Sequence, residues 1–132
     1  MMQNKNVKRV LNMTDEWNRI SADDATLVMG CVIARKEFVE QNPAAVKKFL
    51  EEYEASIKAV KAEVENAATL CETYKVIPKA ALAKMAIPNC GLVYKDKGLM
   101  RHQLEAYLKV LYAYNPAAIG GQLPAEDFYY VG

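Results

Sequence analysis

The chain lacks most of the residues from which catalytic and metal sites are built. It has one histidine, His102, and three cysteines, Cys31, Cys71 and Cys90, without metal-ligand spacing among them. One histidine cannot build a zinc site, and no nucleophile–base pair can be recognised. The glycine pair at 120–121 lacks the lysine and the strand–loop–helix context of a phosphate-binding loop. We therefore expect no catalytic residue, no metal and no cofactor.

The chain also lacks an excess of charge and a long hydrophobic run. Seventeen basic and sixteen acidic residues leave a net charge of +1, which gives no electrostatic basis for binding nucleic acid or anionic lipid. The most apolar run, ATLVMGCVIA at 25–34, is far shorter than the roughly 20 residues of a membrane-spanning helix. The first ten residues contain no apolar core of a signal peptide. At 132 residues, the chain has the size of one domain.

The most strongly patterned stretch predicts an amphipathic helix over about residues 43–64. Asn42 and Pro43 suit a helix start, because asparagine can cap free amides and proline at the first position sacrifices no hydrogen bond. Apolar residues then recur at steps of three and four, namely Val46, Phe49, Leu50, Tyr53, Ile57, Val60 and Val64. Lysine and glutamate fill the opposite face, with i,i+4 pairs that add a few tenths of a kcal/mol each.

The uncharged run at 25–34 predicts a strand that is buried on both faces. It shows no alternation of apolar and polar residues, as is typical of strands covered on both sides. A buried helix is the alternative, but Gly30 and the β-branched Thr26, Val32 and Ile33 argue against it. A strand followed directly by a helix indicates an α/β layer, so we expect the apolar stripe of the helix to pack on this strand.

Shorter elements are predicted on either side of this pair. We expect a weak strand over 5–13, a turn or helix start at 14–17, short helices from 65 to about 76 and over 79–87, a strand fragment at 92–94, and a long helix over 99–112. Cys31 and Cys71 are expected to pack as small apolar residues, and a Cys31–Cys90 bridge is left open. The predicted class is α/β and helix-rich, with a small sheet flanked by helices.

Three stretches, in this order, resemble the C-terminal part of ABC-transporter substrate-binding proteins. They are LVMGCVIARKEFVEQNPAAVKKFLEEYEASIKAV at 27–60, KAALAKMAIPNCGLVY at 79–94 and YNPAAIGGQLPAEDFYY at 114–130. The likeness covers roughly residues 7–130 and is to the group that binds nitrate, sulfonates, taurine and thiamine-pyrimidine precursors. It implies the periplasmic-binding-protein type 2 fold, in which two α/β lobes clamp a small solute and the chain crosses between the lobes twice.

The resemblance implies how the chain is divided and where it works. Residues 1–26 would be a remnant of the second lobe, and 27–132 would be the crossover strand and the helical part of the first lobe, with the return crossover at 27–35. Proteins of this family are about twice as long, so the chain resembles an incomplete or truncated lobe. The implied function is non-catalytic capture of a small-molecule solute. The implied partner is an ABC permease, and the implied location is extracellular or periplasmic, as a membrane-associated lipoprotein.

The resemblance also suggests ligand contacts. Trp17 offers a flat apolar wall and one N–H donor, and glycine permits close approach of a ligand to the backbone. Packing in the core or at the surface is the alternative for each position. The candidate ligand-binding residues are Trp17, Met29, Gly30, Asn89, Cys90 and Gly91.

Two other functions remain open on the sequence. One is a structural or interaction module that associates with itself, because the run at 27–33 carries no charge to discourage pairing; we expect a homo-oligomer, with exchange of the strand near 7–11 as one route. The other is an enzyme similar to thiamine-pyrimidine synthases. Those enzymes use a cysteine-rich iron motif and an active-site histidine, whereas Cys31, Cys71 and Cys90 are scattered here and His102 stands alone.

Overall fold

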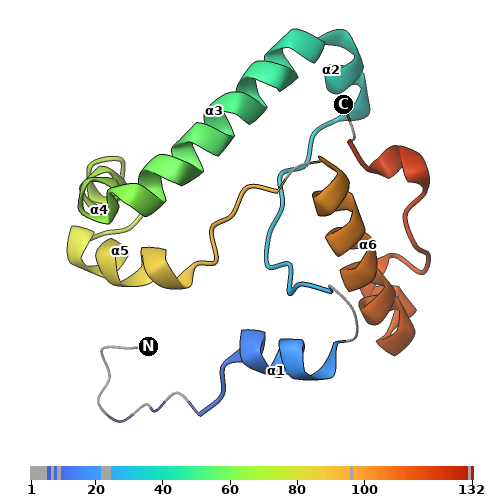
Figure 1. Cartoon of the computed structure of the whole chain (residues 1–132), viewed down its shortest axis with the longest axis horizontal. Coiled ribbons are helices and arrows are strands. Elements are labelled where there is room, and N and C mark those ends of the chain that lie inside the picture. The colour runs from blue at the N-terminus through green and yellow to red at the C-terminus, as the bar shows by residue number, and fades with distance from the viewer. Residues whose placement is uncertain (1–5, 7, 9, 22–24, 96, 131) are drawn as a thin grey trace. The chain divides into compact units, whose positions relative to one another are not determined.

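The chain forms two compact units. The computed structural model describes residues 6, 8, 10–21, 25–95, 97–130 and 132. One unit combines Met1–Val32 with Lys95–Gly132, and the other is Ile33–Tyr94. The chain therefore passes between the units twice, and the connecting stretches around residues 25–35 and 91–95 are drawn as coil in Figure 1.

The described residues are all-α, so the predicted α/β class with a small sheet is wrong. Helices hold 66% of these residues, and no strand occurs among them. Residues 25–34 have no regular secondary structure, so the strand predicted there is wrong, and most of their side chains are exposed. A strand needs a hydrogen-bonded partner, which a local apolar pattern cannot supply. The strand fragment predicted at 92–94 is not formed either.

The weak strand expected at 5–13 is not formed in its described part either. Asn12 and Met13 lie at the start of a helix, and Leu11 is exposed. Lys5, Val7 and Arg9, and with them part of the strand proposed for exchange near 7–11, lie outside the described residues.

The unit Ile33–Tyr94 is built around the predicted long helix. This helix, α3, spans Pro43–Ala62 with Pro43 at its start, as expected. A short helix that the sequence pattern did not reveal, α2 (Lys36–Gln41), precedes it. Asn42 separates the two, and its side-chain amide donates to the carbonyl of Phe38 at 3.0 Å instead of capping α3. Pro43 has no N–H to continue the ladder of α2, so the chain breaks here.

The apolar stripe of α3 is only partly covered. Ile57 is buried, whereas Phe49 is 48% exposed. The Phe49 ring stacks on that of Tyr53 with centroids 5.7 Å apart, and Tyr53 meets the ring of Tyr94 edge-on at 6.2 Å. The expected packing of this stripe on a strand is therefore wrong, since Ile33 is 82% exposed.

The charged face of α3 is as predicted. Lys–Glu pairs at i,i+4 join Lys47 to Glu51 at 4.0 Å, Lys48 to Glu52 at 3.8 Å and Lys58 to Glu54 at 2.7 Å. Most of these side chains are well exposed, so each pair contributes little to stability.

A helical hairpin supplies the core of this unit. Helix α4 (Val64–Thr73) is followed by α5 (Ala80–Ala86), which packs against it. Helix α5 continues directly into the 3₁₀ turn η1 (Ile87–Asn89). The buried residues at its centre are Ala67, Ala68, Ala83 and Ile87. Because alanine has so short a side chain, the two backbones approach closely. A Lys84–Glu65 ion pair crosses the hairpin at its surface.

Hydrogen bonds from the backbone and from Glu72 shape the turn of the hairpin. The amide of Lys75 donates to the carbonyl of Glu72, and Lys75 has a φ of 59°, in the left-handed region. The amide of Val76 then donates back to the carbonyl of Cys71 at 2.8 Å. On the far side, a carboxylate oxygen of Glu72 accepts the amide of Ala80 at 2.9 Å. Glu72 thereby satisfies a free amide at the start of α5.

Replacing Lys75 by glycine should stabilise the hairpin by about 0.5–1 kcal/mol. A lysine in the left-handed region brings its Cβ too close to a backbone carbonyl, and glycine removes that contact. Lys61→Gly in α3 is the matched control, because glycine inside a helix should cost about 1 kcal/mol. Urea unfolding of both variants measures the difference. Equal destabilisation by the two changes would contradict the prediction.

The second unit is built on the last long helix. Helix α6 spans Lys97–Tyr114 and ends before Pro116, as predicted. Helix α1 (Met13–Ile20) is capped by Asn12, whose side chain accepts the amide of Thr14 at 3.1 Å. After α6, the chain makes the 3₁₀ turns η2 (Pro116–Ile119) and η3 (Glu126–Phe128). Gly120 and Gly121 have φ values of 82° and 86°, which other residues rarely adopt.

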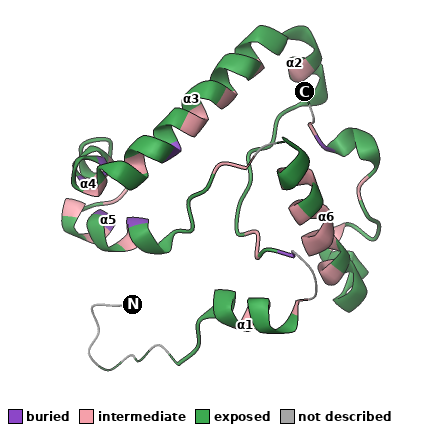
Figure 2. Ribbon diagram, in the orientation of Figure 1, coloured by how far each residue is buried: buried purple, intermediate pink, exposed green. Residues whose placement is uncertain are grey.

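Little of the described chain is buried (Figure 2). The buried residues are Ala25, Ile57, Ala67, Ala68, Ala83, Ile87 and Tyr129. All three cysteines are free; Cys71 is half-buried beside the hairpin core, but Cys31 is exposed, so its expected burial in a strand is wrong. No helix among the described residues is long and apolar enough to cross a membrane.

Candidate functional site

The candidate ligand residues fall in both units. Trp17, Met29 and Gly30 belong to the unit built on α6, and Asn89, Cys90 and Gly91 belong to the other. Their role in ligand binding stays a prediction. The structure gives the surroundings of each.

Trp17 joins α1 to the rest of its unit. Its indole N–H donates to the carbonyl of Ala25 at 2.5 Å, and its ring lies 5.1 Å from that of Tyr107 on α6, tilted by 49°. Ala25 is buried, and Trp17 is half-buried. The N–H donor expected to face a ligand is thus engaged by the backbone, and one part of the ring remains accessible.

Met29 and Gly30 lie in the segment 25–34, which has no regular secondary structure, and both are exposed. Met29 is 69% exposed, and a Cβ added at Gly30 would meet no atom within 4 Å. A ligand or another chain therefore has free access to this backbone.

Asn89, Cys90 and Gly91 form the turn that leaves η1, and all three are exposed. The side-chain amide of Asn89 donates to the carbonyl of Met85 at 2.9 Å. The backbone amide of Cys90 donates to the carbonyl of Ile87 at 3.2 Å. Gly91 has a φ of 60°, so the turn itself requires glycine here. These contacts explain the turn without a ligand.

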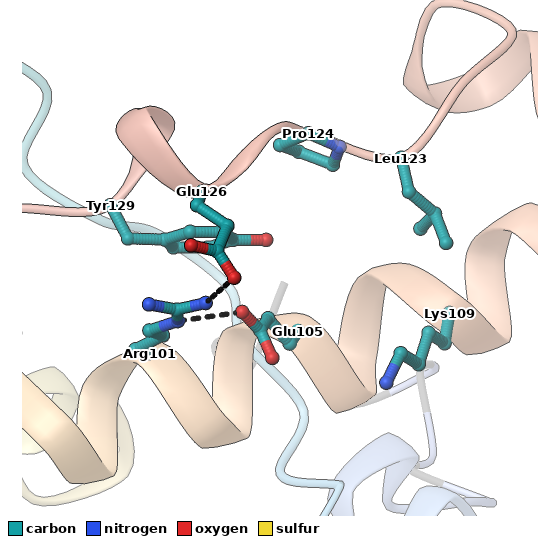
Figure 3. Close-up of a pocket in the computed structure, with 7 residues that line it drawn as sticks. All are labelled: Arg101, Glu105, Lys109, Leu123, Pro124, Glu126 and Tyr129. Carbon is teal, nitrogen blue, oxygen red and sulfur yellow. Dashed lines mark hydrogen bonds and ion pairs between the residues drawn. The ribbon is translucent and has the colours of Figure 1, made fainter.

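A hollow of about 260 Å³ lies between α6 and the C-terminal segment, and the sequence pattern did not point to it. Its lining residues are Arg101, Glu105, Lys109, Leu123, Pro124, Glu126 and Tyr129. Figure 3 shows dashed lines from Arg101 to both glutamates, with Lys109 farther along the helix and Leu123 on the C-terminal segment. The i,i+4 spacing of Arg101 and Glu105 on α6 could have predicted their ion pair. The contacts of Arg101 with Glu126 and Tyr129 depend on the fold of the C-terminal segment.

Arg101 contacts three of the other residues that line this hollow. Its Nε donates to Glu105 at 2.8 Å, its terminal nitrogen lies 3.6 Å from Glu126, and its guanidinium lies 5.4 Å from the ring centre of Tyr129. The hydrogen bond to Glu105 raises the pKa of Arg101, and burial opposes the shift. Burial raises the pKa of Tyr129, and the charge of Glu105 raises it further, whereas the charge of Arg101 lowers it. The arrangement holds the C-terminal segment against α6.

The charges of the hollow limit what it can bind. Two carboxylates balance Arg101, and Lys109 makes no ion pair with any described residue. Within the described part of the chain, no three histidine, cysteine or acidic side chains gather in a way that could hold a metal ion. The hollow is therefore suited to a small polar group near Lys109.

Comparison with protein-family models, with curated proteins and with solved structures gave no match to this chain. The resemblance to substrate-binding proteins thus rests on the three sequence stretches alone.

Proposed function

We propose that this chain is part of the solute-binding component of an ABC importer and works by non-catalytic capture of a small solute. The observation that supports the proposal is the division into two compact units that the chain joins twice. The first passage, at Val32–Ile33, falls within residues 27–35, the stretch that the resemblance marks as a crossover. An ABC permease would be the partner, and the working location would be extracellular or periplasmic.

The proposal rests on this connection and not on the sheet, which the described residues do not form. Capture of a solute needs accessible groups that can meet it. Trp17 offers the accessible part of an indole ring, and the turn at Asn89–Gly91 offers exposed polar groups.

Titration of the chain with small solutes tests this proposal. Trp17 is the sole tryptophan, so its fluorescence reports on its own surroundings. We expect taurine, an alkanesulfonate, nitrate or an aminopyrimidine to change the emission in the millimolar range, with sodium chloride at equal ionic strength as the control. We expect no micromolar binding, because Trp17 is only half-buried and the turn at 89–91 is exposed. The absence of any response beyond that of salt would overturn the proposal.

A second function, a structural module that associates with itself, is favoured by the surface. Large apolar side chains are exposed in both units, among them Met29, Ile33, Phe49, Tyr114 and Phe128. Where such side chains adjoin one another, they offer a surface for association. A flat solute titration combined with concentration-dependent association would favour this function over solute capture.

A further inference from the structure

The segment at residues 27–34 has no regular secondary structure and combines an uncharged sequence with several β-branched or apolar side chains. Its residues make no hydrogen bond within the described part of the chain. It lies between two fixed points: Ala25, which accepts the Trp17 indole, and Arg35, whose carbonyl accepts the amide of Val39 at the start of α2. The side chains of Val32 and Ile33 are 53% and 82% exposed. A row of free amides and carbonyls beside β-branched side chains is a template for strand pairing.

The charges at the two ends of the segment select its partner. In the sequence, Asp23 and Asp24 precede it, Arg35 and Lys36 follow it, and no charged residue lies between. Antiparallel pairing of two copies would bring the acidic end of each onto the basic end of the other. Parallel pairing would bring like charges together, which destabilises a strand pair.

We propose that residues 27–34 pair antiparallel with the same residues of a second copy of the chain, about a two-fold axis at Gly30. The proposal is independent of the solute-capture function. Two-fold pairs of this kind are self-complementary, and the axis sets one residue opposite itself. With Gly30 at the axis, apolar residues face each other throughout: Val28 opposite Val32, Leu27 opposite Ile33 and Met29 opposite Cys31. Such cross-strand pairs are the unit of stabilisation in a sheet.

The length of the segment sets the strength of the association. A two-stranded pair is marginally stable by itself, and a contact of this length buries less surface than a standard protein interface. We therefore expect affinity in the micromolar range. The strand pair should also add antiparallel β-structure, which the described residues of one chain lack. The amide I infrared band of antiparallel strands should therefore grow with protein concentration.

Sedimentation velocity of Val32→Lys and Val76→Lys tests the pairing. We expect the unsubstituted chain to move from the 14.8 kDa of one copy toward twice that mass as its concentration rises. Val32→Lys puts a charge into the segment and should weaken association at least tenfold. Val76→Lys is the matched control, because Val76 is 72% exposed and lies in the hairpin turn; it should associate like the unsubstituted chain. A chain that stays monomeric, or equal behaviour of both variants, overturns the proposal.

Charge reversal tests the direction of the strands. Arg35→Asp sets acidic residues against each other in an antiparallel pair and should weaken association severalfold. With Gly30 at the axis, Arg35 lies diagonally across from Asp23 of the other copy, so Asp23→Arg combined with Arg35→Asp swaps the two charges and should restore association. Arg35 makes no side-chain cap contact at the start of α2, so the helix should form in both variants. Failure of the swap to restore association would overturn the antiparallel arrangement.

Discussion

Replacing Ala83 by aspartate should destabilise the α4–α5 hairpin by about 3 kcal/mol or more. Ala83 is fully buried, with 0% of its surface exposed, and it packs among Ala67, Ala68 and Ile87. A carboxylate there would be buried without a partner, and its desolvation is not repaid.

Ala81→Asp is the matched control for this change. Ala81 lies one residue into α5 and is exposed, and an acidic residue near a helix start is favourable. Its free energy of unfolding should change by no more than about 0.5 kcal/mol. Urea unfolding followed by far-UV circular dichroism compares the two. If Ala83→Asp unfolds at the same urea concentration as Ala81→Asp, the hairpin is not the core of its unit.

Replacing Trp17 by alanine should release α1 from its unit at a cost of about 2–3 kcal/mol. No residue of α1 is buried, so its attachment depends on the ring contact with Tyr107 and on the bond to Ala25. A fully buried tryptophan would cost about 3–5 kcal/mol, and Trp17 is half-buried.

Trp17→Phe separates the two contributions. Phenylalanine keeps an aromatic ring beside Tyr107 but lacks the N–H donor, so it should cost about 1 kcal/mol. Amide hydrogen exchange of α1 measures the local opening in each variant. Exchange rates in α1 that are unchanged by Trp17→Ala would show that other contacts hold this helix.

The helices could be predicted because their signals are local. Pro43 fixes the start of α3, and the spacing of three and four residues from Val46 to Val60 indicates its apolar face. Pro116 likewise limits the end of α6. The short α2 was missed because six residues show too little periodicity. The apolar pattern of residues 25–34 predicted a strand that the described residues do not form. A strand forms only when a second segment pairs with it, and a local sequence pattern does not show which segment that is.

The hollow beside α6 shows the same limit. Arg101 and Glu105 are four residues apart, and their pair could have been predicted from the sequence. Glu126 and Tyr129 reach them only because the chain turns back at Gly120 and Gly121. The glycine pair was visible in the sequence, but the length and direction of the returning segment depend on the packing of the whole unit.

The alanine core of the hairpin also bears on the order in which the unit Ile33–Tyr94 folds. Ala67, Ala68 and Ala83 lose no rotamer freedom when they are buried, and α4 and α5 are near neighbours in the chain. Contacts between near neighbours require little loop closure, so they form early. The hairpin should thus be the first element of this unit to assemble, with α3 docking afterwards through Ile57 and Val60.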